Sequence, residues 1–362
     1  MTNYIKDQIT LHPSITPSDV VKMCFQAAYG AEHLLSDIGK VCGYFVYEYE
    51  NCQPNTSSLT EFIADEVCRV NLAAWKKHKL PWEWLFKLFV QSAAVSVKGG
   101  DVRFFEYIGA WSDFIKTLEG GGSGAAKDLL SKNVKLGFTL AEFQAYFQEY
   151  MDNCEGGKPQ AVHHSPQYRE AETPAYRVVS GAFIRLVPIL QRLDGVRIIA
   201  IDGPSASGKS TLGAGLAAIL GAQLIHMDDF FLPLDMRTPE RLKEPGGNIH
   251  YERFAEEILP HIGVGKPFTY RVFDCETMTY ARTRRVEAAP YIIVEGSYSH
   301  HPLFNDYMDL KVVSDVAQGE QLKRVLSRNG DEIADMFTTK WIPMEEEYFN
   351  AFGVKKNAHI VV

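Results

Sequence analysis

Eight residues decide how the second half of the chain folds: GPSASGKS, residues 203–210. They match the pattern G-x-x-x-x-G-K-[ST] and lie between a short apolar run at 196–201 and a helical segment that begins near Lys209. Glycines let such a loop curl so that successive backbone N–H groups point at phosphate oxygens, and the following helix adds its positive N-terminal end. The stretch therefore predicts a phosphate-binding loop between a strand and a helix.

The polar residues of this loop predict the ligand. Lys209 can reach the β- and γ-phosphates of a nucleotide as a point charge, and the Ser210 hydroxyl can ligate magnesium. We therefore expect ATP and Mg²⁺ as cofactors. The residues predicted to bind the nucleotide are Gly203, Ser205, Ala206, Ser207, Gly208, Lys209, Ser210 and Thr211.

Strands and helices alternate on both sides of this loop from Gly195 onward. Apolar runs predict further strands at 222–227, 291–294 and 310–313, and helical patterns cover 251–262, 321–326 and 331–352. Alternation of this kind is typical of a parallel sheet with helices on both faces. We predict an α/β fold over 195–362, a parallel sheet of the P-loop NTPase type flanked by helices. The tail at 358–362 either adds an edge strand or pairs with a partner.

Acidic residues stand where the predicted strands end. Asp228 and Asp229 follow the strand at 222–227, and Glu295 ends the strand at 291–294. Ligands of open α/β sheets bind beyond such carboxyl ends. We expect Ser210 and Glu295 to hold magnesium, and Asp228 or Asp229 to orient the hydroxyl that is phosphorylated. The alternative is that these acids are ordinary loop or cap residues.

Two arginines complete the predicted catalytic set of Lys209, Asp228, Arg324 and Arg328. Arg324 and Arg328 lie four residues apart, on one face of a predicted helix. They could neutralise charge on the transferring phosphoryl group. A solvated basic face is the other interpretation.

Residues 1–194 show capping signals and apolar residues at helical spacing, which predicts a mainly α-helical N-terminal domain. Capping signals occur at 16–19 and at 139–142, and apolar stripes at helical spacing occupy 82–89 and 104–118. Similar spacing predicts a helix from Thr60 to about Ala74 and a last helix over 174–193. The two predicted domains are therefore 1–194 and 195–362.

Composition limits the function classes. The formal net charge of −8 argues against a broad nucleic-acid-binding surface. No apolar run is long enough to span a bilayer, and the first residues lack the apolar stretch of a signal peptide. The six cysteines are scattered without C-x-x-C pairs, which favours reduced thiols in the cytoplasm. We expect a cytoplasmic protein that acts on a small molecule, and association into a homo-oligomer stays open.

The second half resembles the uridine kinase family, within the wider group that includes phosphoribulokinase and pantothenate kinase. The resemblance rests on GPSASGKST at 203–211, MDDFF at 227–231, VEGSY at 294–298, the Arg324/Arg328 segment and KWIPMEEEYF at 340–349. It implies phosphorylation of a nucleoside-like alcohol by ATP, with Asp228 as base and the two arginines in a mobile lid. The resemblance also implies that Ser210, Asp228 and Glu295 surround magnesium.

The departures from that family fall on the acceptor side. His250 stands where the family often has an aspartate that grips ribose hydroxyls, and Phe273-Asp274 replaces a Tyr-Asp pair. A kinase is therefore a firmer expectation than a kinase of uridine. The candidate acceptor contacts are Asp229, His250, Tyr270, Arg271 and Asp274, and plain hairpin residues are the alternative.

The N-terminal half resembles a helical region fused to such kinases in bacteria, through the segments 25–34, 163–169 and 174–177. That resemblance implies no activity. His33, His163 and His164 with Glu32 could form a metal or acid–base cluster, or they could be buried or capping histidines.

Taken together, these patterns predict an ATP-dependent kinase that transfers the γ-phosphoryl group to a hydroxyl of a small molecule, with a nucleoside such as uridine as the first candidate. The alternative is a nucleotide-dependent ATPase or switch that regulates the N-terminal helical domain. Turnover that requires an acceptor would separate the first hypothesis from the second.

Overall fold

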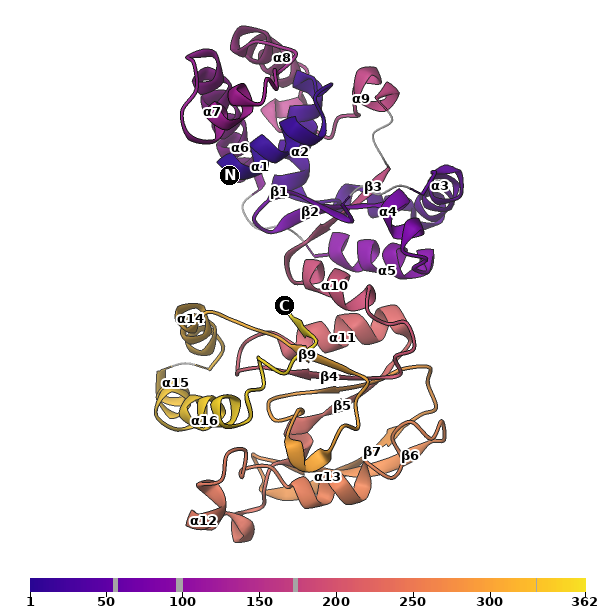
Figure 1. Cartoon of the computed structure of the whole chain (residues 1–362), viewed down its shortest axis with the longest axis vertical. Coiled ribbons are helices and arrows are strands. Elements are labelled where there is room, and N and C mark those ends of the chain that lie inside the picture. Colours follow the sequence, from indigo (N-terminus) through magenta and orange to yellow (C-terminus); the bar gives the residue numbers. More distant parts are fainter. Residues whose placement is uncertain (55–57, 96–99, 172–174, 330) are drawn as a thin grey trace. The chain divides into compact units, whose positions relative to one another are not determined.

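The structure is a computed structural model that describes residues 1–54, 58–95, 100–171, 175–329 and 331–362. The chain forms two compact units, Met1–Ile184 and Arg185–Val362 (Figure 1). The boundary between the units therefore lies ten residues before Gly195, where the sequence pattern changes. None of the helices in the described ranges combines the length and the apolar character needed to cross a bilayer.

Helices make up most of the first unit. Predicted caps are present: Thr16 N donates to Asp19 Oδ2 (3.0 Å) at the start of α2, and Thr139 N donates to Glu142 Oε2 (2.7 Å) at the start of α8. Most of the predicted stripe of α6 is buried, namely Phe104, Ile108, Trp111, Phe114 and Ile115, whereas Phe105 is 45% exposed. The α-helices before the unit's last strand are α1 (Thr2–Leu11), α2 (Pro17–Tyr29), α3 (Ile38–Asn51), α4 (Leu72–Lys77), α5 (Trp82–Ala93), α6 (Gly100–Glu119), α7 (Gly124–Ser131), α8 (Leu140–Asp152) and α9 (Pro166–Glu170).

A three-stranded antiparallel sheet also belongs to the first unit. Two helix predictions that overlap its strands were wrong. The segment after Thr60 forms β1 (Thr60–Ala64) and β2 (Val67–Asn71), with the short α4 after them. The predicted helix over 174–193 is replaced by β3 (Tyr176–Ser180), a 3₁₀ segment (Gly181–Leu186) and α10 (Val187–Leu190). Because β3 pairs with β2 across about a hundred residues of chain, local spacing did not reveal the pairing.

The second unit contains the predicted parallel sheet. Its strand order is β10-β9-β4-β8-β5, and every neighbouring pair is parallel. The strands are β4 (Ile198–Asp202), β5 (Gln223–His226), β8 (Ile292–Glu295), β9 (Leu310–Val313) and β10 (Ile360–Val361). The C-terminal tail thus adds an edge strand.

Helices and a hairpin complete the second unit. Helix α11 (Lys209–Leu220), which follows the loop, packs against β4, β5 and β8. An antiparallel hairpin of β6 (Phe268–Asp274) and β7 (Thr279–Val286) lies beside β5, next to α13 (Tyr251–Glu257) (Figure 1). The remaining α-helices are α12 (Pro239–Leu242), α14 (Gln318–Asn329), α15 (Asp331–Met336) and α16 (Ile342–Phe352), and a π-helical stretch (Phe337–Trp341) joins the last two.

Candidate active site

The loop between β4 and α11 has the strained backbone that its glycines permit. Gly203 has φ 142° and Gly208 has φ 91°, values that favour glycine. A Cβ atom on Gly203 would lie 2.1 Å from the carbonyl oxygen of Ser314, so no side chain fits there. The loop therefore curls tightly from the central strand into the N-terminus of α11.

Lys209 and Ser210, the first residues of α11, contact two different neighbours. Lys209 is 9% exposed, and its Nζ donates to the carbonyl oxygen of Pro204 (2.9 Å), so the ammonium folds back over the loop. Ser210 Oγ donates to Glu295 Oε2 (3.1 Å) at the end of β8. The structure thus brings together the loop hydroxyl and the strand-end carboxylate that the sequence singled out.

Glu295 also contacts a histidine that sequence reasoning missed. Glu295 is 3% exposed, and its Oε1 lies 2.5 Å from His226 Nδ1. The two residues are register partners at the ends of β8 and β5. Because parallel neighbours end at the same edge, a polar residue one position before Met227 was a detectable signal.

Asp228 belongs to a 3₁₀ turn, Met227–Phe230, that follows β5. The residue reaches solvent, but its carboxyl lies among protein groups that remove part of its hydration. This desolvation raises the pKa of Asp228, and the charges of Glu295 and Glu345 add to the rise, whereas Lys209 opposes it. The carboxyl of Asp228 is therefore close enough to Lys209 and Glu295 for their charges to shift its pKa.

Asp229 has a different role from its neighbour. It is buried and accepts a hydrogen bond from Tyr270 Oη (2.8 Å), and Arg284 Nη1 lies 3.5 Å from the same oxygen. Arg253 donates to the backbone oxygens of Asp229 and Arg271. Asp229 and Tyr270 therefore attach the hairpin to the strand end.

The other three candidate acceptor contacts each have an internal partner. His250 caps α13, accepting from Arg253 N (3.3 Å). Arg271 forms an ion pair with Glu257 (2.5 Å). Asp274 accepts from the backbone N–H groups of Glu276 and Thr277 in the hairpin turn. These bonds account for all three side chains within the hairpin and α13.

The two arginines of α14 contact different groups. Arg324 Nη1 donates to the carbonyl oxygen of Ala206 in the loop (3.4 Å), and its Nε pairs with Glu320 (2.9 Å). The Arg328 guanidinium lies 5.8 Å from the ring centroid of Phe337. Arg324 thus contacts the phosphate-binding loop.

Glu345 of α16 holds the loop from the opposite side, and sequence reasoning missed it. Its carboxylate accepts from Ser205 N (2.8 Å), Ser205 Oγ (2.5 Å) and Ser297 Oγ (2.7 Å), and the residue is 5% exposed. The only signal was its place within the 340–349 motif.

Asp202, at the end of β4, is a second carboxylate that sequence reasoning missed. It is fully buried and accepts from Gly203 N (2.7 Å), Tyr298 N (3.1 Å), His300 N (2.9 Å) and Tyr348 Oη (2.8 Å). These four donors tie the start of the loop to the segment after β8 and to α16.

Arg185 fastens the far side of the loop. It donates to the carbonyl oxygen of Ser207 (2.9 Å), to Ser314 Oγ (2.6 Å) and to the carbonyl oxygen of Val362 (2.8 Å). The loop is thus fixed by groups far apart in the sequence. This support keeps its backbone in the curled form.

The donor set fits magnesium, which prefers oxygen ligands and usually keeps water and phosphate oxygens among them. The Ser210 hydroxyl and the Glu295 carboxylate are in contact, and Asp228 lies in the same field. Across the described ranges, no group of three or more His, Cys, Asp or Glu side chains is arranged to hold a metal. His33, His163 and His164 therefore do not form such a group.

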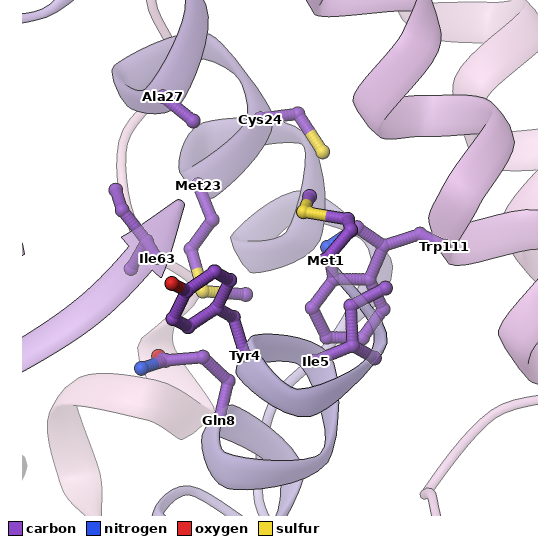
Figure 2. Close-up of a pocket in the computed structure, with 9 residues that line it drawn as sticks. All are labelled: Met1, Tyr4, Ile5, Gln8, Met23, Cys24, Ala27, Ile63 and Trp111. Carbon is purple, nitrogen blue, oxygen red and sulfur yellow. The ribbon is translucent and has the colours of Figure 1, made fainter. Parts of the chain in front are cut away.

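A small apolar hollow of about 230 Å³, counted with the part open to solvent, lies in the first unit (Figure 2). Figure 2 shows side chains of Tyr4, Met23 and Trp111 around it, with Gln8 as its one amide. It includes no residue of the phosphate-binding loop and no charged side chain.

Comparisons with known proteins give the following result. The chain matches no protein-family model and no curated protein. Among solved structures it is similar to a possible uridine kinase from Bacillus stearothermophilus, with 21% identity and a TM-score of 0.37 over 46% of this chain and 88% of that one. It is also similar to a proposed fructose transport system kinase from Silicibacter sp. TM1040, with 21% identity and a TM-score of 0.37 over 47% and 91%.

Proposed function

We propose that the second unit is an ATP-dependent kinase that transfers the γ-phosphoryl group to a hydroxyl of a small molecule, with Mg²⁺ as cofactor and a nucleoside such as uridine as the first acceptor to test. One observation carries the proposal: the glycine loop enters α11 with Ser210 bonded to Glu295 on the adjacent strand. A hydroxyl and a carboxylate so placed beside phosphate-binding amides are the ligands that a magnesium–nucleotide complex needs.

In this mechanism the loop amides and Lys209 bind the phosphates. The hydrogen bond of Lys209 to the Pro204 carbonyl is the one that must be exchanged for a phosphate oxygen, because the ammonium donates to no other described residue. Bound magnesium would neutralise phosphate charge, held by Ser210 and Glu295. Arg324, already at the Ala206 carbonyl, needs only a side-chain movement to approach the same charge.

Asp228 is the group that receives the acceptor's proton. Its raised pKa brings it closer to neutral pH, which suits a base that takes a proton from a hydroxyl. Since phosphoryl transfer has a loose transition state, the main contribution of Asp228 is to orient the hydroxyl.

The test is ADP formation by the full chain with MgATP, measured against a panel of nucleosides, vitamins and sugar alcohols. We expect ADP formation to rise severalfold with at least one acceptor, together with a phosphorylated product detected by mass spectrometry. The Lys209→Ala variant serves as the control and should be silent. Equal ADP formation with and without every acceptor would instead support the nucleotide-dependent switch, and absence of Mg-nucleotide binding would refute both.

A further inference from the structure

A buried polar cluster in the first unit joins segments from three parts of the chain. Asp19, Lys22 and Gln26 share one face of α2, at spacings of three and four residues. Arg69 of β2 and Tyr176 of β3 project from the same face of the sheet, because Tyr176 lies two residues from Val178, the register partner of Arg69. His164 and Ser165, just before α9, and Tyr168 within α9 complete the cluster, and they belong to the 163–169 segment, which the proposed kinase does not use.

Asp19 is satisfied by local donors. Its carboxylate accepts from Thr16 N and Oγ1, from Ser165 N and Oγ, and it lies 2.8 Å from His164 Nδ1. Burial raises the pKa of Asp19, but the hydrogen bonds from His164, Ser165 and Thr16 outweigh that effect and hold the pKa well below its usual range. The negative charge of Asp19 is therefore spread over its own neighbours and is not paired with Arg69.

His164 links this carboxylate to a tyrosine. Its Nε2 lies 2.5 Å from Tyr176 Oη, and its ring stacks on Tyr168 at 3.9 Å between centroids. Burial lowers the pKa of His164 to about 4, so the ring is neutral at pH 7. Because Nδ1 faces a carboxylate, Nδ1 carries the hydrogen and Nε2 accepts from the Tyr176 hydroxyl. The tyrosine hydroxyl is thus held in one orientation.

Arg69 is a buried cation whose partners are all neutral. It is 1% exposed, and it donates to Gln8 Oε1 (3.4 Å), Tyr168 Oη (3.3 Å) and Gln26 Oε1 (3.0 Å). Its guanidinium lies 4.4 Å from the ring centroid of Tyr176, and its Nε has no hydrogen-bond partner among the described residues. A buried charge without an opposite charge is costly in free energy.

Carboxylates of the described chain do not supply the missing charge. Arg69 forms no ion pair in the described ranges, and Glu61, its register partner on β1, contacts His12 (2.9 Å) instead. Glu48 pairs with Arg177, whose guanidinium lies over the Phe45 ring. Arg69 is therefore left with dipoles alone.

Lys22 is a second cation, close enough to Arg69 for the charge of Arg69 to act on its pKa. No hydrogen bond or ion pair joins it to another described residue, and it is partly exposed. Burial, together with the charges of Arg69 and Arg169, lowers the pKa of Lys22 to about 8, although Asp19 and Glu48 oppose this shift. The cluster therefore holds a second positive charge, at a position that is partly exposed to solvent.

We propose that Arg69 and Lys22 bind the oxyanion group, phosphate or carboxylate, of a small ligand in the first unit. The oxyanion supplies the negative charge that Arg69 lacks and an acceptor for its unpaired Nε. A guanidinium and an ammonium together are the usual recognition set for such groups. The proposal does not depend on the kinase activity of the second unit.

The test is isothermal titration of the full chain carrying Lys209→Ala, so that the phosphate-binding loop does not contribute. Inorganic phosphate and succinate are titrated separately. We expect at least one of them to bind, and Arg69→Gln to weaken that binding about tenfold or more, because a charge-assisted hydrogen bond is lost. Binding of phosphate alone would assign the ligand to phosphate esters, and binding of succinate alone would assign it to carboxylates.

Two further variants keep the test decisive if Arg69→Gln fails to fold. Lys22→Gln removes a cation that bonds to no described residue, so it should fold normally and still weaken the anion severalfold. Lys158→Gln, an exposed lysine elsewhere in the same unit, is the matched control and should leave the affinity unchanged. The proposal is overturned if neither anion binds, or if Lys22→Gln binds as tightly as the control.

Discussion

Replacing Gly203 by alanine tests whether the curled phosphate-binding loop is as tightly enclosed as the structure requires. The new Cβ would lie 2.1 Å from the Ser314 carbonyl oxygen and 3.0 Å from its carbonyl carbon, and both are backbone atoms that cannot rotate away. Overpacking of this kind costs about 1–3 kcal/mol. The left-handed φ of 142° adds about 1–3 kcal/mol for a residue with a side chain. We therefore expect a loss of about 4 kcal/mol, taking the middle of the two ranges.

The measurement must report on the second unit alone, because two units need not unfold together. Hydrogen exchange of peptides from β4 and α11, followed by mass spectrometry, gives the local free energy of opening. Gly319→Ala is the matched control, since a Cβ there meets no atom within 4 Å and its φ is ordinary for a helix. The control should be neutral or stabilising by about 0.5–1 kcal/mol. A loss below about 1 kcal/mol for Gly203→Ala would show that the loop relaxes freely and would refute the enclosure.

Three further predictions concern single side chains. Lys209→Ala should abolish nucleotide turnover in the ADP assay, because no other lysine or arginine replaces its charge inside the loop; undiminished turnover would remove the loop from the mechanism. Asp228→Asn should lower kcat far more than it weakens ATP binding, and the wild-type kcat should fall as the pH drops through the raised pKa of Asp228, since the base must be ionised; a collapse of ATP affinity at constant kcat would contradict this role. Asp19 has a lowered folded pKa, so it stabilises the first unit above its unfolded pKa, and this contribution is lost as the pH falls below about 4. Asp19→Asn should therefore flatten the acid side of the stability curve measured by hydrogen exchange of α2, and an unchanged pH dependence would count against the buried carboxylate.

The features that could be predicted from the sequence are those that depend on residues close together in the chain. The loop at 203–210, the apolar strands around it and the capping boxes at 16–19 and 139–142 each depend on short spacings. By contrast, Glu345 reaches Ser205 across 140 residues, and no local pattern marks it. Its carboxylate contacts the loop only because α16 packs beside β4 in the folded unit, through Tyr348 and Asp202.

The errors in the first unit have a similar origin. Phe62, Ile63, Val67 and Val70 fit a helical period, but the same residues lie in two short strands around a turn at 65–66, and β2 is buried along its whole length rather than alternating. The strand pairing that decides between these patterns comes from β3, far along the chain. Tertiary pairing overrode local preference here.

The hydrogen bonds at the strand ends separate Asp228 from the other acids. Asp202, Asp229, Glu295 and Glu345 each accept from donors of the second unit, and those bonds hold the loop, the hairpin and α16 in place. Asp228, in contrast, accepts no hydrogen bond from any described residue, although Lys209, Glu295 and Glu345 all act on its pKa. An acid that serves structure needs its donors in the resting protein, whereas a base must keep its oxygens available for the proton of the acceptor. Among these carboxylates at the edge of the sheet, Asp228 is therefore the one whose oxygens are available to take a proton from an acceptor. The others accept hydrogen bonds that hold the folded unit together.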